Sequence, residues 1–224
     1  MFLSIDKPKG ITSHDVIDQI RRITGKKRVG HAGTLDPNAT GLLIVGIGKE
    51  STKKLGKITK DTKKTYEAEI YLGEERDSDD SEGVIISKVK GFLPPVENEV
   101  RLILTTFLGR QKQMPPDFSA VKTKGKKAYE LARRGKPVGL KPKDVVIYSI
   151  KLVTYKYPTL IIETTVSSGT YIRALARDVG QRLGCGAYLK ELRRTEVGES
   201  SVEKAIKLSK LTKRNWKKFV IDIG

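Results

Sequence analysis

A single carboxylate stands in a glycine-rich stretch of the chain, GHAGTLDPNATGLLIVGIG, which covers residues 30–48. Asp36 lies directly before Pro37, and a proline ring keeps the preceding residue in an extended conformation. The flanking glycines let the backbone turn tightly or approach a ligand closely. An isolated Asp-Pro pair is more typical of a turn before a buried strand than of a reactive site, so other parts of the chain must decide between the two interpretations.

The chemistry open to Asp36 is limited by what accompanies it in the sequence. No second carboxylate lies near it in the chain, which argues against two-carboxylate hydrolysis. There is no Walker P-loop and no dinucleotide-binding fingerprint. A lone carboxylate can act as a covalent nucleophile without a metal or cofactor, and an arginine beside it would keep it ionised.

Metal binding is not indicated by the remaining candidate ligands. Two histidines and one cysteine do not make a soft-ligand site. The acidic stretch from Asp77 to Glu82 resembles a calcium loop only superficially, since Glu82 stands where an EF-hand requires glycine and Lys88 where it requires glutamate. We therefore expect a solvated turn there, no metal site, and no cofactor.

The charge balance favours a polyanionic partner. The 224 residues carry 44 Lys and Arg against 26 Asp and Glu, a net charge of +18. Thermophilic proteins are also rich in lysine, but here the cations are not matched by acids. The chain shows no membrane-spanning stretch and no signal-peptide core, and its one cysteine, Cys185, cannot form an internal disulfide. These features predict a cytoplasmic protein without a membrane partner.

The basic residues concentrate in the segment from Arg110 to Lys143. It holds eleven Lys or Arg, Lys124 among them, against Asp117 and Glu130, which is +9. Charge runs are usually solvated surface, so a surface insertion is the plain alternative. A second basic run covers residues 53–64, and the two together favour contact with a phosphate backbone.

The apolar periodicity predicts a mixed arrangement of helices and strands. We expect helices where apolar residues recur every three to four positions, and strands where they alternate or run together. Ser13 is the expected N-cap of the first helix, and Arg173 and Arg177 share one face of the last. The expected helices cover residues 13–25, 98–109, 126–135 and 170–184, and the expected strands cover 41–48, 64–73, 84–89, 144–157 and 159–168.

Six segments in the same order resemble the TruB family of tRNA pseudouridine synthases. The pattern GTLDPxAxGLL followed later by SGTYIRxLARDxG is highly specific for this family. The matching segments are DKPKGITS (6–13), VGHAGTLDPNATGLL (29–43), KTYEAEI (64–70), SAVKTKGKKAYELARRG (119–135), SSGTYIRALARDVGQRLG (167–184) and YLKELRRTEVG (188–198).

The resemblance implies that Asp36 is the nucleophile that detaches a uracil from its ribose before the base is rejoined through carbon. Whether the carboxylate attacks the base or first generates a glycal-like sugar stays open. Arg173 matches the arginine that pairs with this carboxylate in the family. Without the motif, Arg173 would be read as a surface residue of a helix.

Four further positions match family residues that bind the substrate. Tyr66 corresponds to the tyrosine that packs on the target base and has been proposed to help move a proton, and His31 to the histidine that contacts RNA where the uridine leaves its stack. Tyr171 and Leu192 correspond to residues lining the uracil pocket. By pattern alone, Tyr66, Tyr171 and Leu192 would be packing residues and His31 an ordinary loop residue.

The family also implies a fold and a substrate. We expect an α+β pseudouridine-synthase fold, with a long, mostly antiparallel mixed β-sheet, flanking helices and a basic thumb-like insertion at about 110–143 that grips the T-arm. One catalytic domain would span residues 1–224, without a complete PUA domain. The expected partner is the T-arm stem-loop of tRNA, whose uridine 55 is flipped out of its stack and isomerised by a monomer that needs no protein partner. Phe118 replaces a frequent tyrosine of the family, so any role of that hydroxyl is lost.

Two alternatives remain open from the sequence. One is the guide-RNA-dependent catalytic subunit of a ribonucleoprotein, against which the missing PUA-like region counts. The other is an RNA-binding or RNA-folding protein that has lost catalysis, against which the intact Asp36, Tyr66 and Arg173 count.

Overall fold

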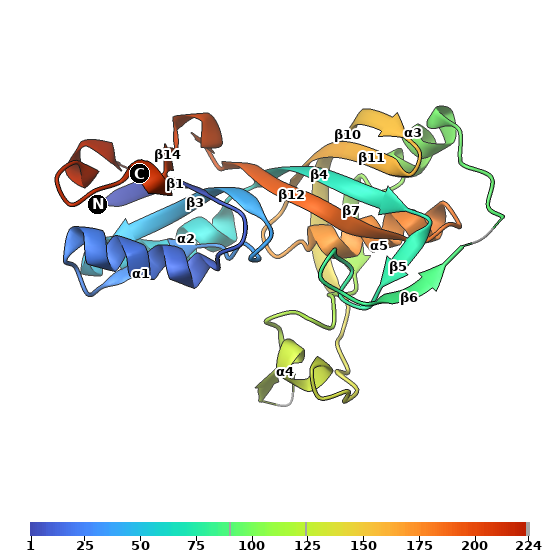
Figure 1. Ribbon diagram of the computed structural model, residues 1–224, viewed down its shortest axis with the longest axis horizontal. Coiled ribbons are helices and arrows are strands. Elements are labelled where there is room, and N and C mark those ends of the chain that lie inside the picture. The colour runs from blue at the N-terminus through green and yellow to red at the C-terminus, as the bar shows by residue number, and fades with distance from the viewer. Residues whose placement is uncertain (90, 124, 223–224) are drawn as a thin grey trace. The chain divides into compact units, whose positions relative to one another are not determined.

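The computed structural model describes residues 1–89, 91–123 and 125–222, so Lys124 of the basic segment lies outside the described residues. The chain forms two compact units, which we describe separately (Figure 1). Unit 1 comprises Met1–Glu67 and Leu192–Gly224, and unit 2 comprises Ala68–Glu191. Two strands, β4 (Lys64–Leu72) and β12 (Ala187–Val197), contribute residues to both units.

Unit 1 is built around two central antiparallel strands, β1 (Phe2–Lys7) and β3 (Thr40–Ile47). Strand β12 pairs with β3 in parallel through Arg193 and Arg194. Shorter strands complete the pairing: β2 (Val29–Ala32) on β3, β13 (Ser200–Ser201) on β12, and β14 (Ile206–Lys207) and β15 (Val220–Ile221) on β1.

Both faces of β3 are buried, which explains its continuous apolar run. Leu43, Val45 and Ile47 face a core that includes residues of the first helix. Leu42 and Ile44 face a second core on the opposite side. The strand predicted over 41–48 is therefore confirmed as a stiff, buried element directly after the Asp36 loop.

Helix α1 (Ser13–Thr24) confirms the first predicted helix but corrects its start. The N-cap is Thr12, not Ser13, because Thr12 and Asp15 form a capping box in which each side chain binds the backbone of the other. Gly25 ends the helix in the left-handed conformation, as expected. Since Thr12 supplies the cap, the Ser13 hydroxyl is available to hydrogen-bond another part of the chain.

The basic run at 53–64 is largely helical. Helix α2 (Lys49–Asp61) places Leu55 against the second core of unit 1, with Ile58 packed beside it. The remaining surface of the helix carries the lysines, so the run is an amphipathic helix rather than a loop. Three short 3₁₀ turns close unit 1: η1 (Val202–Lys204), η2 (Leu208–Lys210) and η3 (Trp216–Phe219).

Unit 2 confirms the predicted strand pair and the last helix. Strands β10 (Lys143–Lys156) and β11 (Thr159–Val166) form an antiparallel hairpin, and β7 (Gly109–Gln113) pairs antiparallel with β10. Helix α5 (Ile172–Arg182) follows β11, with Tyr171 as its N-cap residue. The remaining elements are the hairpin of β5 (Glu74–Arg76) and β6 (Ile85–Lys88) and helix α3 (Glu97–Thr105).

The basic segment leaves β7 and returns in β10, where Gln113 pairs with Lys143. Between these strands it forms a small hairpin of β8 (Lys122–Thr123) and β9 (Lys126–Lys127), followed by the short helix α4 (Ala128–Ala132). Figure 1 shows α4 away from the strands and helices that form the body of unit 2.

The α+β class and the large mixed sheet are confirmed. Within the described part of the chain, the main sheet has eleven strands. Its parallel pairs β1–β14 and β12–β3 stand beside the antiparallel pairs β1–β3, β2–β3, β7–β10 and β10–β11.

Candidate active site

Asp36 begins a tight turn between β2 and β3. Its carbonyl accepts a hydrogen bond from the Ala39 N–H at 3.1 Å, and Pro37 and Asn38 are the two central residues of the turn. Proline suits the second position of such a turn because its φ is already set. The Asp36 side chain is half-buried.

The residues on both sides of Asp36 are fixed by the end of β1, the loop that follows it and the first residue of α1. The Ser13 hydroxyl donates to the Leu35 carbonyl and accepts from the Leu35 N–H, both at 2.9 Å. The Pro37 carbonyl accepts from the Gly10 N–H at 2.9 Å and from Lys7 Nζ at 3.1 Å. The nucleophile candidate is therefore fixed through its chain neighbours.

Arg194 holds both ends of the loop that carries Asp36. Its side chain is almost fully buried, with 1% exposed. Nη2 donates to the Gly33 carbonyl at 3.0 Å, and Nε donates to the Leu42 carbonyl at 2.7 Å. Gly41 lets β12 come this close: its φ is +102°, and a Cβ there would lie 2.2 Å from the Arg194 carbonyl oxygen.

Burial and mutual repulsion shape the charges around this loop. Burial lowers the pKa of Lys7 to about 8, although the negative charge of Asp36 partly offsets the effect. Burial, reinforced by the charge of Arg194, also lowers the pKa of Lys64 to about 8. Lys64 Nζ donates to the Thr59 and Thr62 carbonyls at 3.0 and 3.3 Å, at the C-terminal end of α2.

Three other residues that were predicted to belong to the site lie in unit 1. Tyr66 is buried on β4, and Leu192 is half-buried on β12, directly before Arg193. His31 is half-buried on β2, and its Nδ1 is buried without a hydrogen-bond partner among the described residues. Burial and the charge of Arg194 lower the pKa of His31, which favours its neutral form.

Arg173 lies in the first turn of α5 and is buried, with 8% exposed. Nη1 contacts the Asp80 carboxylate at 3.1 Å and donates to the Ser78 carbonyl at 3.2 Å. Nη2 donates to the Phe118 carbonyl at 3.2 Å. Phe118 thus contributes through its backbone, a role that does not depend on which aromatic ring stands there.

One turn later, Arg177 binds the same acidic stretch. Nη1 contacts the Asp79 carboxylate at 2.7 Å, and Nη2 donates to the Met114 carbonyl at 3.0 Å. Asp79 is buried and has a φ of +61°. Burial raises the pKa of Asp79 to about 6, against the opposing influence of Arg177 and Arg173.

The prediction of a solvated turn from Asp77 to Glu82 is therefore confirmed at its exposed ends, Asp77 and Glu82, but wrong for its middle. Ser78 and Asp79 are buried, because two arginines on one face of α5 bind this stretch. The signal was present in the sequence: a buried guanidinium requires acceptors, and two arginines four residues apart on one helix face point to the same partner segment.

The predicted site residues divide between the two units. Unit 1 holds Asp36, His31, Tyr66 and Leu192, and unit 2 holds Tyr171 and Arg173. The expected pairing of Arg173 with Asp36 stays a prediction.

Residues that sequence reasoning did not identify fix the backbone on which Asp36 lies. They are Lys7 and Arg194, both buried in unit 1. Lysine and arginine are rarely buried, so composition and periodicity give no reason to place them inside. Lys7 lies in the segment DKPKGITS and Arg194 in YLKELRRTEVG, which both match the family, but the resemblance gave neither residue a role.

Two general features concern metals and membranes. Among residues 1–89, 91–123 and 125–222, no three or more His, Cys, Asp or Glu side chains gather as metal ligands would. No helix in this part of the chain is both long and apolar enough to cross a bilayer.

Comparison with family descriptions gives two adjoining matches. The N-terminal domain of the TruB family pseudouridylate synthases matches residues 21–172. The C-terminal domain of tRNA pseudouridylate synthase B matches residues 173–221.

Curated proteins similar to this chain are tRNA pseudouridine synthases B. The protein from Thermosipho melanesiensis is 42% identical over 222 residues, which cover 99% of this chain and 72% of the relative. The protein from Aquifex aeolicus is 41% identical over 226 residues, covering 99% and 77%. The protein from Prochlorococcus marinus strain SARG is 45% identical over 216 residues, covering 96% and 68%.

Solved structures of Cbf5 complexes share the fold. A Cbf5–Nop10–Gar1 complex matches with a TM-score of 0.72 and 28% identity, over 99% of this chain and 56% of that chain. The archaeal box H/ACA sRNP Nop10–Cbf5 complex matches with a TM-score of 0.69 and 26% identity, over 97% and 55%. The chain thus spans just over half the length of these structures, and the predicted fold is confirmed.

Proposed function

Because the chain belongs to the TruB family of pseudouridine synthases, we propose that it isomerises uridine 55 in the T-loop of tRNA, with Asp36 as the nucleophile. The matched relatives carry the name tRNA pseudouridine synthase B, which supports tRNA as the substrate class.

The observation that carries this proposal is the rigid setting of Asp36. Leu35 is bound by Ser13, Pro37 by Gly10 and Lys7, and the loop ends by Arg194. A reactive group held in one geometry before the substrate arrives avoids an entropic cost at the transition state. A turn that merely joins two strands does not require a buried arginine and a buried lysine to hold it.

The proposed reaction rearranges bonds within one nucleotide. The bond between C1′ of the ribose and N1 of the uracil breaks, and a bond between C1′ and C5 forms. The proton on C5 is released and N1 takes up a proton, so the isomerisation needs no oxidant and no co-substrate. We propose that Asp36 forms the transient covalent bond, that Arg173 keeps its carboxylate ionised, and that Tyr66, Tyr171 and Leu192 enclose the base.

The target base must leave its stack before it meets Asp36, which costs a few kcal/mol. We propose that His31 lies where the uridine leaves the RNA fold. The basic segment at 110–143 would act as the gripping thumb, since its +9 charge can bind phosphates and hold the folded stem-loop by its shape.

A guide-dependent role is the second candidate, because a matched archaeal structure belongs to a box H/ACA complex. The identities of 41–45% to tRNA pseudouridine synthases B exceed the 26–28% to the Cbf5 structures, which favours the unguided enzyme.

The test uses a T-arm stem-loop that carries uridine tritiated at C5. The proposal expects tritium release from the bare stem-loop with no guide RNA, and modification at the single T-loop position. Release only after a guide RNA is added would support the ribonucleoprotein role. Tight RNA binding without any release would support a catalytically silent RNA-binding protein.

We further propose that the protein acts as a monomer in the cytoplasm. The charge of +18 disfavours association of copies with one another, since like charges repel. Sedimentation of the protein at its assay concentration tests this, and a dimer mass would contradict it.

A further inference from the structure

Gln113, the last residue of β7, binds the backbone at the start of helix α5. Its side chain is buried, with 4% exposed. Its Oε1 accepts from the Tyr171 N–H at 2.8 Å, and its Nε2 donates to the Tyr171 carbonyl at 3.1 Å. A primary amide carries a donor and an acceptor side by side, so it can satisfy both backbone groups of one residue.

Two arginines of α5 bind the chain that directly follows Gln113. Arg177 donates to the Met114 carbonyl at 3.0 Å, and Arg173 donates to the Phe118 carbonyl at 3.2 Å. The first residues of the basic segment are thus fastened to the first two turns of α5 at three points. The returning strand is fixed at the same place, since Lys143 pairs with Gln113.

We propose that Gln113 is a positioning residue, which fastens the start of the basic segment to α5 and so sets the position of Tyr171 and Arg173. The inference rests on the proposed function, because it assigns the basic segment to RNA binding and Tyr171 and Arg173 to the reaction. RNA held by the segment would then find the reactive residues already in place. The entropic cost of fixing the orientation of α5 is then part of folding and does not reduce the affinity for RNA.

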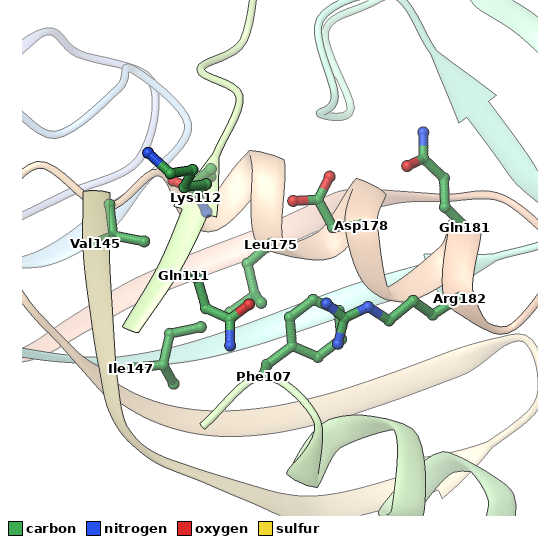
Figure 2. Close-up of a pocket in the computed structure, with 10 residues that line it drawn as sticks. Phe107, Gln111, Lys112, Val145, Ile147, Leu175, Asp178, Gln181 and Arg182 are labelled. Carbon is green, nitrogen blue, oxygen red and sulfur yellow. The ribbon is translucent and has the colours of Figure 1, made fainter. Parts of the chain in front are cut away.

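A second glutamine on the same strand provides a matched control. Gln111 lies two residues earlier on the same face of β7. Both glutamines line a cavity of about 330 Å³ between β7, β10 and α5, in which Figure 2 labels Gln111. The Gln111 amide donates to the Thr106 and Leu108 carbonyls, both at 3.4 Å, which lie just after α3 and outside the basic segment. Its loss should therefore leave α5 in position.

The experiment compares Gln113→Leu, Gln113→Glu and Gln111→Leu with the wild type. Three quantities are measured: the single-turnover rate of tritium release from the T-arm stem-loop, the Kd for that RNA, and hydrogen exchange at the Tyr171 amide. For Gln113→Leu we expect a rate lower by about 10- to 100-fold, a nearly unchanged Kd, and faster exchange at Tyr171. Gln111→Leu should leave exchange at the Tyr171 amide as it is in the wild type and should lower the rate by much less than Gln113→Leu does.

Gln113→Glu makes the test sharper through its pH dependence. A protonated carboxyl offers a donor and an acceptor, as the amide does, whereas a carboxylate can only accept. The rate of Q113E relative to the wild type should therefore recover as the pH falls, which general destabilisation would not produce.

Three results would overturn the proposal: an unchanged rate in Gln113→Leu, a rate loss shared equally by Gln111→Leu, or an unchanged exchange rate at Tyr171. Failure of the proposed function is distinct, since it would show as absent tritium release from the wild type. The exchange measurement would still decide whether Gln113 fastens α5.

Discussion

In unit 1 the buried cations Lys7, Lys64 and Arg194 donate to backbone carbonyls, whereas in unit 2 Arg173 and Arg177 also contact the carboxylates of the 78–80 stretch. Both arrangements satisfy the donors of a charged group taken out of water. They differ in what happens when the cation is removed. A carboxylate left behind can take up a proton, but a carbonyl cannot change its state.

The difference matches the proposed tasks of the two regions. Of the carbonyl-bound cations, Lys7 and Arg194 fix the backbone around Asp36. The Arg–Asp pairs of unit 2 instead join side chains of α5 to the acidic stretch. The pKa of Asp79, raised to about 6 by burial, shows that this second arrangement lies close to a change of protonation.

The largest expected effect on stability is that of Arg194→Met. It leaves the half-buried Gly33 carbonyl and the buried Leu42 carbonyl without the Arg194 donor, which should cost about 2–5 kcal/mol in the free energy of unfolding. Carbonyls do not titrate, so the loss should be the same at pH 7 and pH 5 when His31, whose pKa Arg194 lowers, is replaced by asparagine in both the variant and its reference protein. Urea denaturation at the two pH values measures it.

The comparison variant is Arg177→Met, which removes the arginine that contacts the buried Asp79 carboxylate. Its cost should be smaller at pH 5 than at pH 7, because the Asp79 carboxyl can then be protonated. A pH-independent cost for Arg177→Met, or a pH-dependent one for Arg194→Met, would contradict the distinction between the two regions.

Ser13→Ala should destabilise the protein by about 1–2 kcal/mol, since it removes both hydrogen bonds to Leu35. Thr12→Ala should cost about 1 kcal/mol through loss of the N-cap of α1. Only Ser13→Ala should also slow tritium release, because Leu35 precedes Asp36. Equal rates for the two variants would show that Ser13 serves folding alone.

In alkaline solution, two buried lysines should make the free energy of unfolding depend on pH. The pKa of Lys7 and of Lys64 is about 8 in the folded protein and 10.5 for a free lysine. Between these values the folded state binds fewer protons than the unfolded state, so the free energy of unfolding should gain a rising contribution with pH. The burial penalty is fully present below about pH 8. Lys7→Met and Lys64→Met should each flatten this slope relative to the wild type, and an unchanged slope would refute the assignment.

The exposed lysines of the basic segment should affect stability least. Replacing Lys122, Lys126 and Lys127 by glutamine should leave unfolding nearly unchanged. It should reduce the slope of log affinity for RNA against log salt by about 0.7–0.9 for each phosphate that is no longer neutralised. An unchanged slope, measured by filter binding across a salt series, would exclude the segment from phosphate contact.

Local periodicity was enough to predict α1, β3, β10, β11 and α5, because each has an apolar pattern that its own sequence displays. Strands β1 and β12 were not predicted. Their charged residues Lys7 and Arg194 interrupt the apolar pattern and are nevertheless buried. The reason is non-local, since their donors meet carbonyls of the Asp36 loop.

Asp36 itself was identified from motif resemblance, not from its surroundings. Ser13 was assigned to the helix cap because serine is a common N-cap, but Thr12 with Asp15 forms the stronger capping box and leaves Ser13 to bind Leu35. The solvated acidic turn was predicted from the acidic composition of the stretch and its mismatch with a calcium loop. Its burial follows from Arg173 and Arg177, more than ninety residues later in the chain.

The nucleophilic role of Asp36 is the central claim, and Asp36→Asn tests it with the smallest change of shape. The measurement is tritium release from the T-arm stem-loop, with RNA affinity measured in parallel. We predict a loss of at least about 10³-fold in the rate, since the nucleophile is removed, and an unchanged Kd, since the phosphate contacts remain. Equal release by the variant and the wild type would contradict this role.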